Sequence, residues 1–237
     1  MKQAVGPHGQ YEFVWDALRN VQTEFKIARL ARQAQKSFRA LKGKKDLKLH
    51  LGSGADIKPG WINIDLAFDR MPQVDAAAQP GTMVINYDLR LKLPLEDNSC
   101  AFIYSSHFFE HLEYRHGLKL LRDCHRVLQP GGVFRAAMPN FRGMFEAYIN
   151  GEYQYTDLVD ILLLLPDVEP GTETYTDYLN YGVYQFGEHK CIYDEEKMVL
   201  LLQKIGFKSV ALSQFEQGID PDTPLRRRYS FYVEAIK

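Results

Sequence analysis

Residues 47–54 read L-K-L-H-L-G-S-G, and residues 55–65 continue A-D-I-K-P-G-W-I-N-I-D. This stretch predicts a short apolar strand, a glycine turn and a second strand that ends on the carboxylate of Asp65. Such a unit opens a parallel α/β sheet, in which ligands bind beyond the carboxyl ends of the strands. The stretch therefore predicts both the fold class and the place of a ligand site.

The sequence of the turn argues against a dinucleotide as the ligand. A dinucleotide site needs a third glycine and a helix whose N-terminus faces the pyrophosphate. Only six residues separate Gly54 from Trp61, and one of them is Pro59, so no useful helix fits. S-adenosylmethionine carries no pyrophosphate, and Gly52 and Gly54 would let the backbone approach its methionine part while Asp65 accepts hydrogen bonds from its ribose. An ordinary turn and a loop carboxylate fit the same residues, so the motif alone does not decide.

The composition sets the class of protein. A chain of 237 residues with 46% hydrophobic residues can fold as one domain with an extension and an insertion. A net charge of −1 implies no global attraction to nucleic acid. The first forty residues lack an apolar signal segment, and the aliphatic run 161–165 is too short to span a bilayer. Three widely spaced cysteines without a C-x-x-C pattern predict neither a disulfide framework nor a zinc finger, which favours a cytoplasmic protein.

A basic amphipathic helix is expected over residues 12–41, within an N-terminal extension of residues 1–45. Residues 1–48 hold eleven Lys and Arg against four Asp and Glu. Apolar residues recur at helical spacing, and Gly43 ends the pattern. The helix could pack on the domain with its charges in water, contact an anionic membrane or a lipid-linked substrate, or form a dimer seam.

Strands and helices then alternate, as in a mostly parallel sheet. A helix is expected over 114–128, closed by the Pro-Gly-Gly at 130–132, and a second over 194–205 between an Asp194 N-cap and Gly206. The predicted strands are 47–51, 61–65, 82–86, 100–105, 133–138, 208–214 and 229–236.

In this order, several motifs resemble class I S-adenosylmethionine-dependent methyltransferases, in particular the group called methyltransferase domain 11. The resemblance covers residue 47 to the C-terminus. It depends on L-H-L-G-S-G, I-N-I-D, Y-D-L-R-L-K-L-P-L-E-D-N-S, Y-S-S-H-F-F-E-H-L, H-R-V-L-Q-P-G-G-V-F and K-I-G-F. It implies a Rossmann-like three-layer sandwich in residues 46–237, with a seven-stranded, mostly parallel sheet and an antiparallel edge strand.

The resemblance also implies S-adenosylmethionine as the cofactor and a role for each matching position. Gly52, Ser53 and Gly54 would line the methionine part, and Asp65 would hold the ribose. The pair Asp88 and Leu89 would face the adenine, and Ser105 and His107 would border the reactive methyl. The chain departs from the family in its short crossover, which puts Asp65 eleven positions after Gly54 where about twenty is usual.

Histidines are the candidate bases. His107 follows the fourth predicted strand at the mouth of the site, and His189 lies in F-G-E-H-K; each could instead be a packed or surface histidine. Residues 107–111, H-F-F-E-H, also match an inverted zinc-protease signature. A strand ends just before this segment and no third ligand follows at helical spacing, so we expect no metal site and a packing role for His111.

Residues 140–190 break the alternation of strands and helices. Residues 141–193 hold nine acids against two bases, and seven tyrosines lie in the insertion. A long irregular segment inside a compact domain is typically a lid or binding loop, and tyrosines suit sugar or aromatic substrates. A small helical subdomain, with 157–165 as one helix, is the alternative. The acidity argues against a nucleic-acid acceptor.

Together these features predict a methyltransferase acting on a small or medium acceptor, by O- or N-methylation in glycan, lipid or natural-product biosynthesis. The acceptor could be glycan- or lipid-linked, the basic helix permits peripheral membrane contact, and a homodimer is possible. Two alternatives remain: a non-catalytic binding or assembly protein with the same fold, and a nucleotide-sugar or NAD enzyme sharing only the sheet.

Overall fold

A computed structural model describes residues 12–66, 79–151 and 174–237. Its centre is a seven-stranded sheet with the order β3-β2-β1-β4-β5-β7-β6. All neighbouring strands pair in parallel except β7, which runs antiparallel to both β5 and β6. The strands are β1 Leu47–Leu51, β2 Ile62–Asp65, β3 Met83–Asn86, β4 Cys100–Ser106, β5 Leu128–Pro139, β6 Ser209–Ser213 and β7 Ser230–Ile236.

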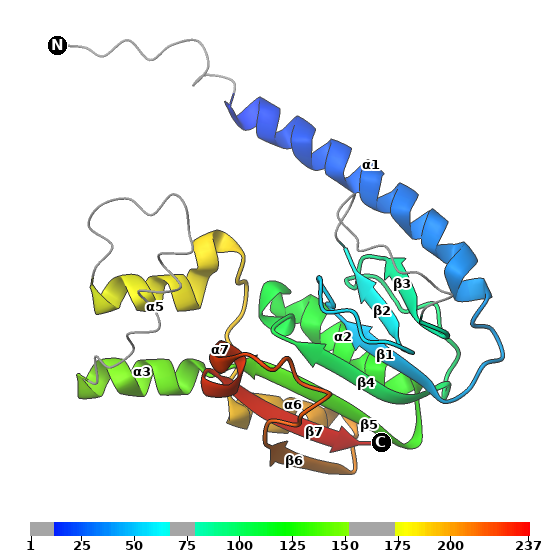
Figure 1. The fold of residues 1–237 in the computed structure, drawn as a ribbon. Helices are drawn as coiled ribbons and strands as arrows, with labels where there is room; N and C mark the ends of the chain where they lie inside the picture. The colour runs from blue at the N-terminus through cyan, green and yellow to red at the C-terminus, as the bar shows by residue number, and fades with distance from the viewer. Residues whose placement is uncertain (1–11, 67–78, 152–173) are drawn as a thin grey trace.

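Helices flank this sheet (Figure 1). The longer ones are α1 Glu12–Arg39, α2 Tyr114–Val127, α3 Phe141–Asn150, α5 Tyr175–Tyr184 and α6 Glu195–Ile205, and the short ones are η1 Phe109–His111, η2 Gln185–Gly187 and α7 Pro224–Arg228. The Rossmann-like, mostly parallel seven-stranded sheet predicted from the sequence is confirmed. The antiparallel strand is β7, one position inside the edge that β6 forms.

Burial explains why these segments form strands. Leu49, Leu51, Ile64 and Ile103 have no exposed surface, and by their register they share one face of the sheet, while His50, Asn63 and Tyr104 are buried on the other. Each fully buried aliphatic side chain contributes about 1.5–3 kcal/mol relative to exposure. The strand ends differ from the predicted ones by a few residues at most, except that β5 already begins at Leu128. The Pro-Gly-Gly follows α2 as predicted, but it lies within this longer strand.

The crossover from β1 to β2 contains no helix, as predicted. The Gly52 amide donates to the Ile64 carbonyl at 2.9 Å, and Leu49 aligns with Ile62 in the parallel register. The chain therefore turns at residues 52–54 and re-enters the sheet directly. This places the turn and the end of β2 side by side at one edge of the sheet.

The first helix is confirmed, but its two halves differ. In its C-terminal part Ile27, Ala34 and Phe38 are buried, and the Phe38 ring packs edge-on against Tyr87 at 5.1 Å. Phe25 keeps 75% of its surface exposed, and toward its N-terminal end the helix extends away from the sheet (Figure 1). Packing on the domain thus accounts for the end of α1 only. No described helix has the length and apolarity needed to cross a bilayer.

The insertion is more regular than the sequence suggested. Helix α3 begins at an Asn140 N-cap, whose side chain accepts from the Gly143 amide, and ends at Gly151 with a φ of 65°. Helix α5 begins with a capping box between Thr174 and Asp177. These helices replace part of the predicted irregular lid; the helix predicted over 157–165 lies outside the described residues.

Candidate functional site

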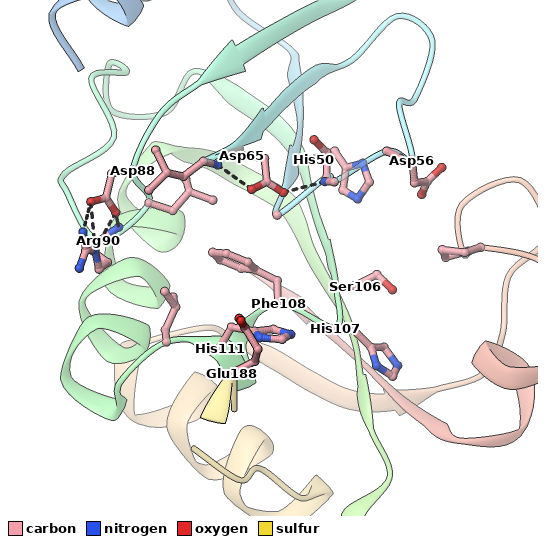
Figure 2. Close-up of a pocket in the computed structure, with 18 of the residues that line it drawn as sticks. His50, Asp56, Asp65, Asp88, Arg90, Ser106, His107, Phe108, His111 and Glu188 are labelled. Carbon is pink, nitrogen blue, oxygen red and sulfur yellow. Dashed lines mark hydrogen bonds and ion pairs between the residues drawn. The ribbon is translucent and has the colours of Figure 1, made fainter. Parts of the chain in front are cut away.

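A cavity of about 700 Å³ opens at the carboxyl ends of β1, β2, β3 and β4. It lies where a parallel α/β sheet is expected to bind a ligand. Figure 2 shows side chains from these strand ends around it, with His107 and His111 opposite Asp65. Of the residues predicted to bind cofactor, those lining the cavity are Gly52, Ser53, Gly54, Asp65, Asp88 and Leu89.

Gly52 and Gly54 in the turn lack side chains for different structural reasons. Gly52 has a φ of 67°, and a Cβ there would lie 2.3 Å from the Phe108 ring. Its role is therefore to let Phe108 pack against the turn. Gly54 also has a positive φ, but a Cβ there would meet nothing within 4 Å. The backbone at Gly54 is open, and it is the part of the turn that a ligand can approach.

The Asp65 carboxylate lies across this turn. One oxygen accepts from the Gly54 amide at 2.6 Å and the other from the Leu66 amide at 2.6 Å (Figure 2). No cation pairs with it among the described residues. Each carboxylate oxygen has further lone pairs, so Asp65 can also accept from a diol. Nearby, the hydroxyl of Ser53 is buried without a hydrogen-bond partner in the described structure.

Asp88 is engaged more fully than the sequence predicts. Its carboxylate accepts from the Arg90 amide at 2.9 Å and from the Arg90 side chain at 2.7–3.0 Å (Figure 2). Arg90 therefore also reaches the cavity wall. Any contact of Asp88 with a ligand amino group would be shared with this guanidinium. The role of Asp88 at the adenine stays a prediction.

The segment after β4 supplies the opposite wall. Ser105 does not line the cavity, whereas Ser106 does. Adjacent residues of a strand point to opposite faces, so the side chain of Ser106 faces the cavity and that of Ser105 faces away from it. His107 follows with a φ of 46°, an uncommon conformation for a residue with a side chain. Its backbone amide donates to the Ala137 carbonyl at 2.9 Å, which fixes the turn.

The His107 ring bridges two elements. Its Nε2 lies 2.7 Å from the Ser230 hydroxyl at the start of β7, and its Nδ1 lies 3.7 Å from Oε1 of Glu110. Burial lowers the pKa of His107 well below the ordinary value, and the nearby Arg226 charge acts in the same direction. The ring is therefore neutral at pH 7 and can accept a proton.

His189 does not line the cavity. It lies behind His111, with ring centroids 4.9 Å apart, and also packs on Phe141. Burial lowers the pKa of both His189 and His111. A direct catalytic role for His189 therefore has less geometric support than one for His107. His111, which the sequence suggested was a packing residue, lines the cavity.

Sequence reasoning also missed His50 and Arg226 as cavity residues. His50 occupies the penultimate position of β1, where a histidine within an apolar strand was a usable signal. Burial, and after it the Lys58 charge, lower the pKa of His50 to about 4. Arg226 lies on α7, and no motif in the polar sequence around it marks it as a cavity residue.

The strand order and a cavity at the carboxyl edge of the sheet are the arrangement expected of a class I, S-adenosylmethionine-dependent methyltransferase fold. Residues 51–136, from the glycine turn into β5, match the family described as "Methyltransferase domain". S-adenosylmethionine is the cofactor that this family and fold imply. The open Gly54 backbone, the unpartnered Ser53 hydroxyl and the Asp65 carboxylate fit its amino-acid and ribose parts.

Two solved structures are similar to this chain, and the first, with a TM-score above 0.5, supports the fold. A chain from the complex of the Haloferax volcanii Trm112 methyltransferase activator with a methyltransferase aligns with a TM-score of 0.52 and 14% identity, over 95% of each chain. A SAM-dependent methyltransferase from Archaeoglobus fulgidus aligns with a TM-score of 0.48 and 17% identity, over 96% of this chain and 100% of the other. No curated protein matches the sequence.

Proposed function

We propose that this protein transfers the methyl group of S-adenosylmethionine to an oxygen or nitrogen of a small or medium acceptor. The observation that carries the proposal is the contact between Asp65 and the Gly54 amide at 2.6 Å. A diphosphate bound at a glycine turn uses such amides as donors. Here the Asp65 carboxylate already accepts from the Gly54 amide, and its negative charge would repel a diphosphate. The same carboxylate would attract a cationic ligand and accept hydrogen bonds from a diol.

Bound S-adenosylmethionine supplies an electrophilic methyl on a sulfonium. When bound, it would give this methyl to the acceptor heteroatom and keep the electron pair of the carbon–sulfur bond on sulfur, while the acceptor proton would pass to a base of the protein. The protein's main contribution is to hold the three atoms in line, which can supply about 7–11 kcal/mol. His107, neutral and at the cavity wall, is the group we assign to receive the proton.

Placement in glycan, lipid or natural-product metabolism remains part of the proposal, as do a homodimer, membrane contact and a cytoplasmic location. The exposed Phe25 on the basic helix α1 supports contact with a surface of some kind. The tyrosines Tyr148, on α3, and Tyr184, on α5, are exposed. Exposed rings of this kind support binding of a sugar or aromatic acceptor.

Calorimetry with S-adenosylhomocysteine tests the cofactor part. We expect micromolar affinity for S-adenosylhomocysteine and none for NAD. The Asp65→Ala variant should bind about 10- to 100-fold more weakly, because hydrogen bonds to a charged group contribute about 1.5–3 kcal/mol. Glu96→Ala, an exposed carboxylate away from the cavity, is the control and should bind as the wild type does.

Affinity for NAD but not for S-adenosylhomocysteine would reject the proposal in favour of a nucleotide enzyme. Tight binding of S-adenosylhomocysteine without methyl uptake by any acceptor pool, measured with radiolabelled S-adenosylmethionine, would favour the non-catalytic alternative.

A further inference from the structure

The wall of the cavity contains a cluster of metal-ligating side chains that cofactor binding does not require. Glu110, His111 and His189 each offer one ligand atom, and these atoms lie within 4.8 Å of one another. Glu110 and His111 belong to η1, directly after the strand end that carries His107. His189 comes from the far end of the insertion.

The chain holds these distant residues together through its backbone. The Glu110 carbonyl accepts from the Lys190 amide at 2.7 Å and from the Cys191 amide at 3.1 Å. These bonds tie the segment after His189 to η1. The sequence-based objection to a metal was that no third ligand follows H-F-F-E-H at helical spacing. The fold brings the third group from a different element instead.

Glu110 is the least expected part of this cluster. It has no exposed surface, and neither carboxylate oxygen has a hydrogen-bond partner in the described structure. A buried carboxylate without partners is costly, so such a group takes up a proton, pairs with a cation or binds a metal. Its described neighbours are His107 Nδ1 at 3.7 Å and His111 Nε2 at 4.0 Å from Oε1. Burial raises the pKa of Glu110 to about 8, and the nearby Arg226 charge opposes this, so a metal ion binding Glu110 would displace its proton.

His189 is oriented as a ligand would be. Its Nδ1 lies 2.8 Å from the Gly182 carbonyl, and because a carbonyl only accepts, Nδ1 carries the proton. The lone pair is then on Nε2. Histidines that bind metals commonly donate their other ring nitrogen to a backbone carbonyl or a carboxylate, which fixes tautomer and orientation.

We propose that Glu110, His111 and His189 bind a divalent first-row transition metal at the wall of the cavity that lies opposite Asp65 (Figure 2). Two imidazoles and one carboxylate favour zinc, iron, cobalt or manganese over magnesium or calcium, which prefer oxygen ligands alone. Two ligands on one ion at about 2.1 Å are about 3–4 Å apart, so modest side-chain rotations would close the cluster. Three protein ligands leave coordination positions open.

The role of this metal rests on the proposed methyl transfer. His111 lines the cavity, so the open positions would be accessible to an acceptor bound there (Figure 2). A bound acceptor oxygen or nitrogen would be oriented by the ion, and its proton would be more acidic because a metal ion lowers the pKa of a coordinated group. The substrate class that this favours is an acceptor with a metal-binding heteroatom next to the methylated atom.

The test uses the full chain freed of metal with a chelator and titrated with Co²⁺. We expect one equivalent to bind, with visible d–d absorption typical of nitrogen and oxygen ligands, and zinc to displace it in calorimetry. His189→Ala and Glu110→Gln should each weaken binding by at least about 100-fold, since even losing a residue that only hydrogen-bonds a metal ligand costs about 10- to 100-fold. His116→Ala, a half-buried histidine on α2, should bind as the wild type does.

Equal Co²⁺ binding by wild type, His189→Ala and Glu110→Gln would overturn the site, and so would no binding by the wild type. If Glu110→Gln fails to fold, His189→Ala alone tests the metal site. S-adenosylhomocysteine affinity of the metal-free protein is measured in parallel. Intact cofactor binding without metal binding rejects only the metal site, whereas metal binding without cofactor binding rejects only the proposed function.

Discussion

Replacing His107 with asparagine should lower the rate of methyl transfer about 10²- to 10⁴-fold, the range over which a general base acts. Asparagine is the informative substitution because it tolerates the positive φ of this position better than alanine does. The affinity for S-adenosylhomocysteine should change little, since the predicted contribution is to proton transfer. Single-turnover kinetics with a competent acceptor and calorimetry on the same preparation measure the two quantities.

The pH dependence of the methyl-transfer rate shows whether His107 acts as a base or only positions the substrate. Because burial lowers the pKa of His107, its neutral form persists below the ordinary histidine value. The acidic limb of the rate profile should therefore lie well below pH 6.5, and His107→Asn should remove it. Ser230→Ala, which removes the hydroxyl 2.7 Å from Nε2, should shift this limb without abolishing turnover. Unchanged turnover in His107→Asn would exclude the general-base role.

The sheet was predictable because its strands are short apolar segments separated by turn residues. The segment 47–51 coincides with β1, and Asp194 and Gly206 limit α6 as expected. Helix caps are local, so one sequence shows them. The same kind of signal was present but overlooked in the insertion, where Asn140 caps α3 and Thr174 forms a capping box with Asp177.

The site was predictable only as far as it follows strand ends. Gly54 and Asp65 meet because parallel strands end at one edge of the sheet, a consequence of topology. The choice of Ser105 over Ser106 depended on the phase of β4, which a one-residue error inverts. The meeting of Glu110 with His189 depends on backbone bonds from residues 190 and 191, and no sequence pattern encodes them.

A second large effect is expected far from this chemistry, at Arg135 in β5. Its side chain has no exposed surface and forms an ion pair with Asp220, whose carboxylate is also fully buried. Its Nη1 donates to Glu234 at 2.7 Å, and its Nη2 donates to the Gln214 carbonyl at 2.6 Å. Arg135→Met would leave the Asp220 charge buried without a cation.

Removing one partner of a buried pair costs about 3–5 kcal/mol, because the remaining charge has lost both water and its counter-ion. For a chain of this size each kcal/mol lowers Tm by about 2–4 °C, so the melting temperature should fall by roughly 6–20 °C. Thermal unfolding followed by circular dichroism measures it. Arg142→Met, which breaks a half-exposed pair with Asp194, is the control and should cost at most about 1 kcal/mol.

The double variant Arg135→Met/Asp220→Leu decides whether the charge is the cause. If the cost comes from an uncompensated carboxylate, removing that carboxylate should restore much of the lost stability, since apolar replacements of buried ion pairs are often neutral. A double variant no more stable than Arg135→Met would instead assign the cost to lost packing. Asp220 also accepts from Tyr104 and precedes Pro221 and Arg226 at the cavity wall. The double variant should therefore regain stability but bind the cofactor more weakly than the wild type, because the loop that leads to the cavity would no longer be anchored at Asp220.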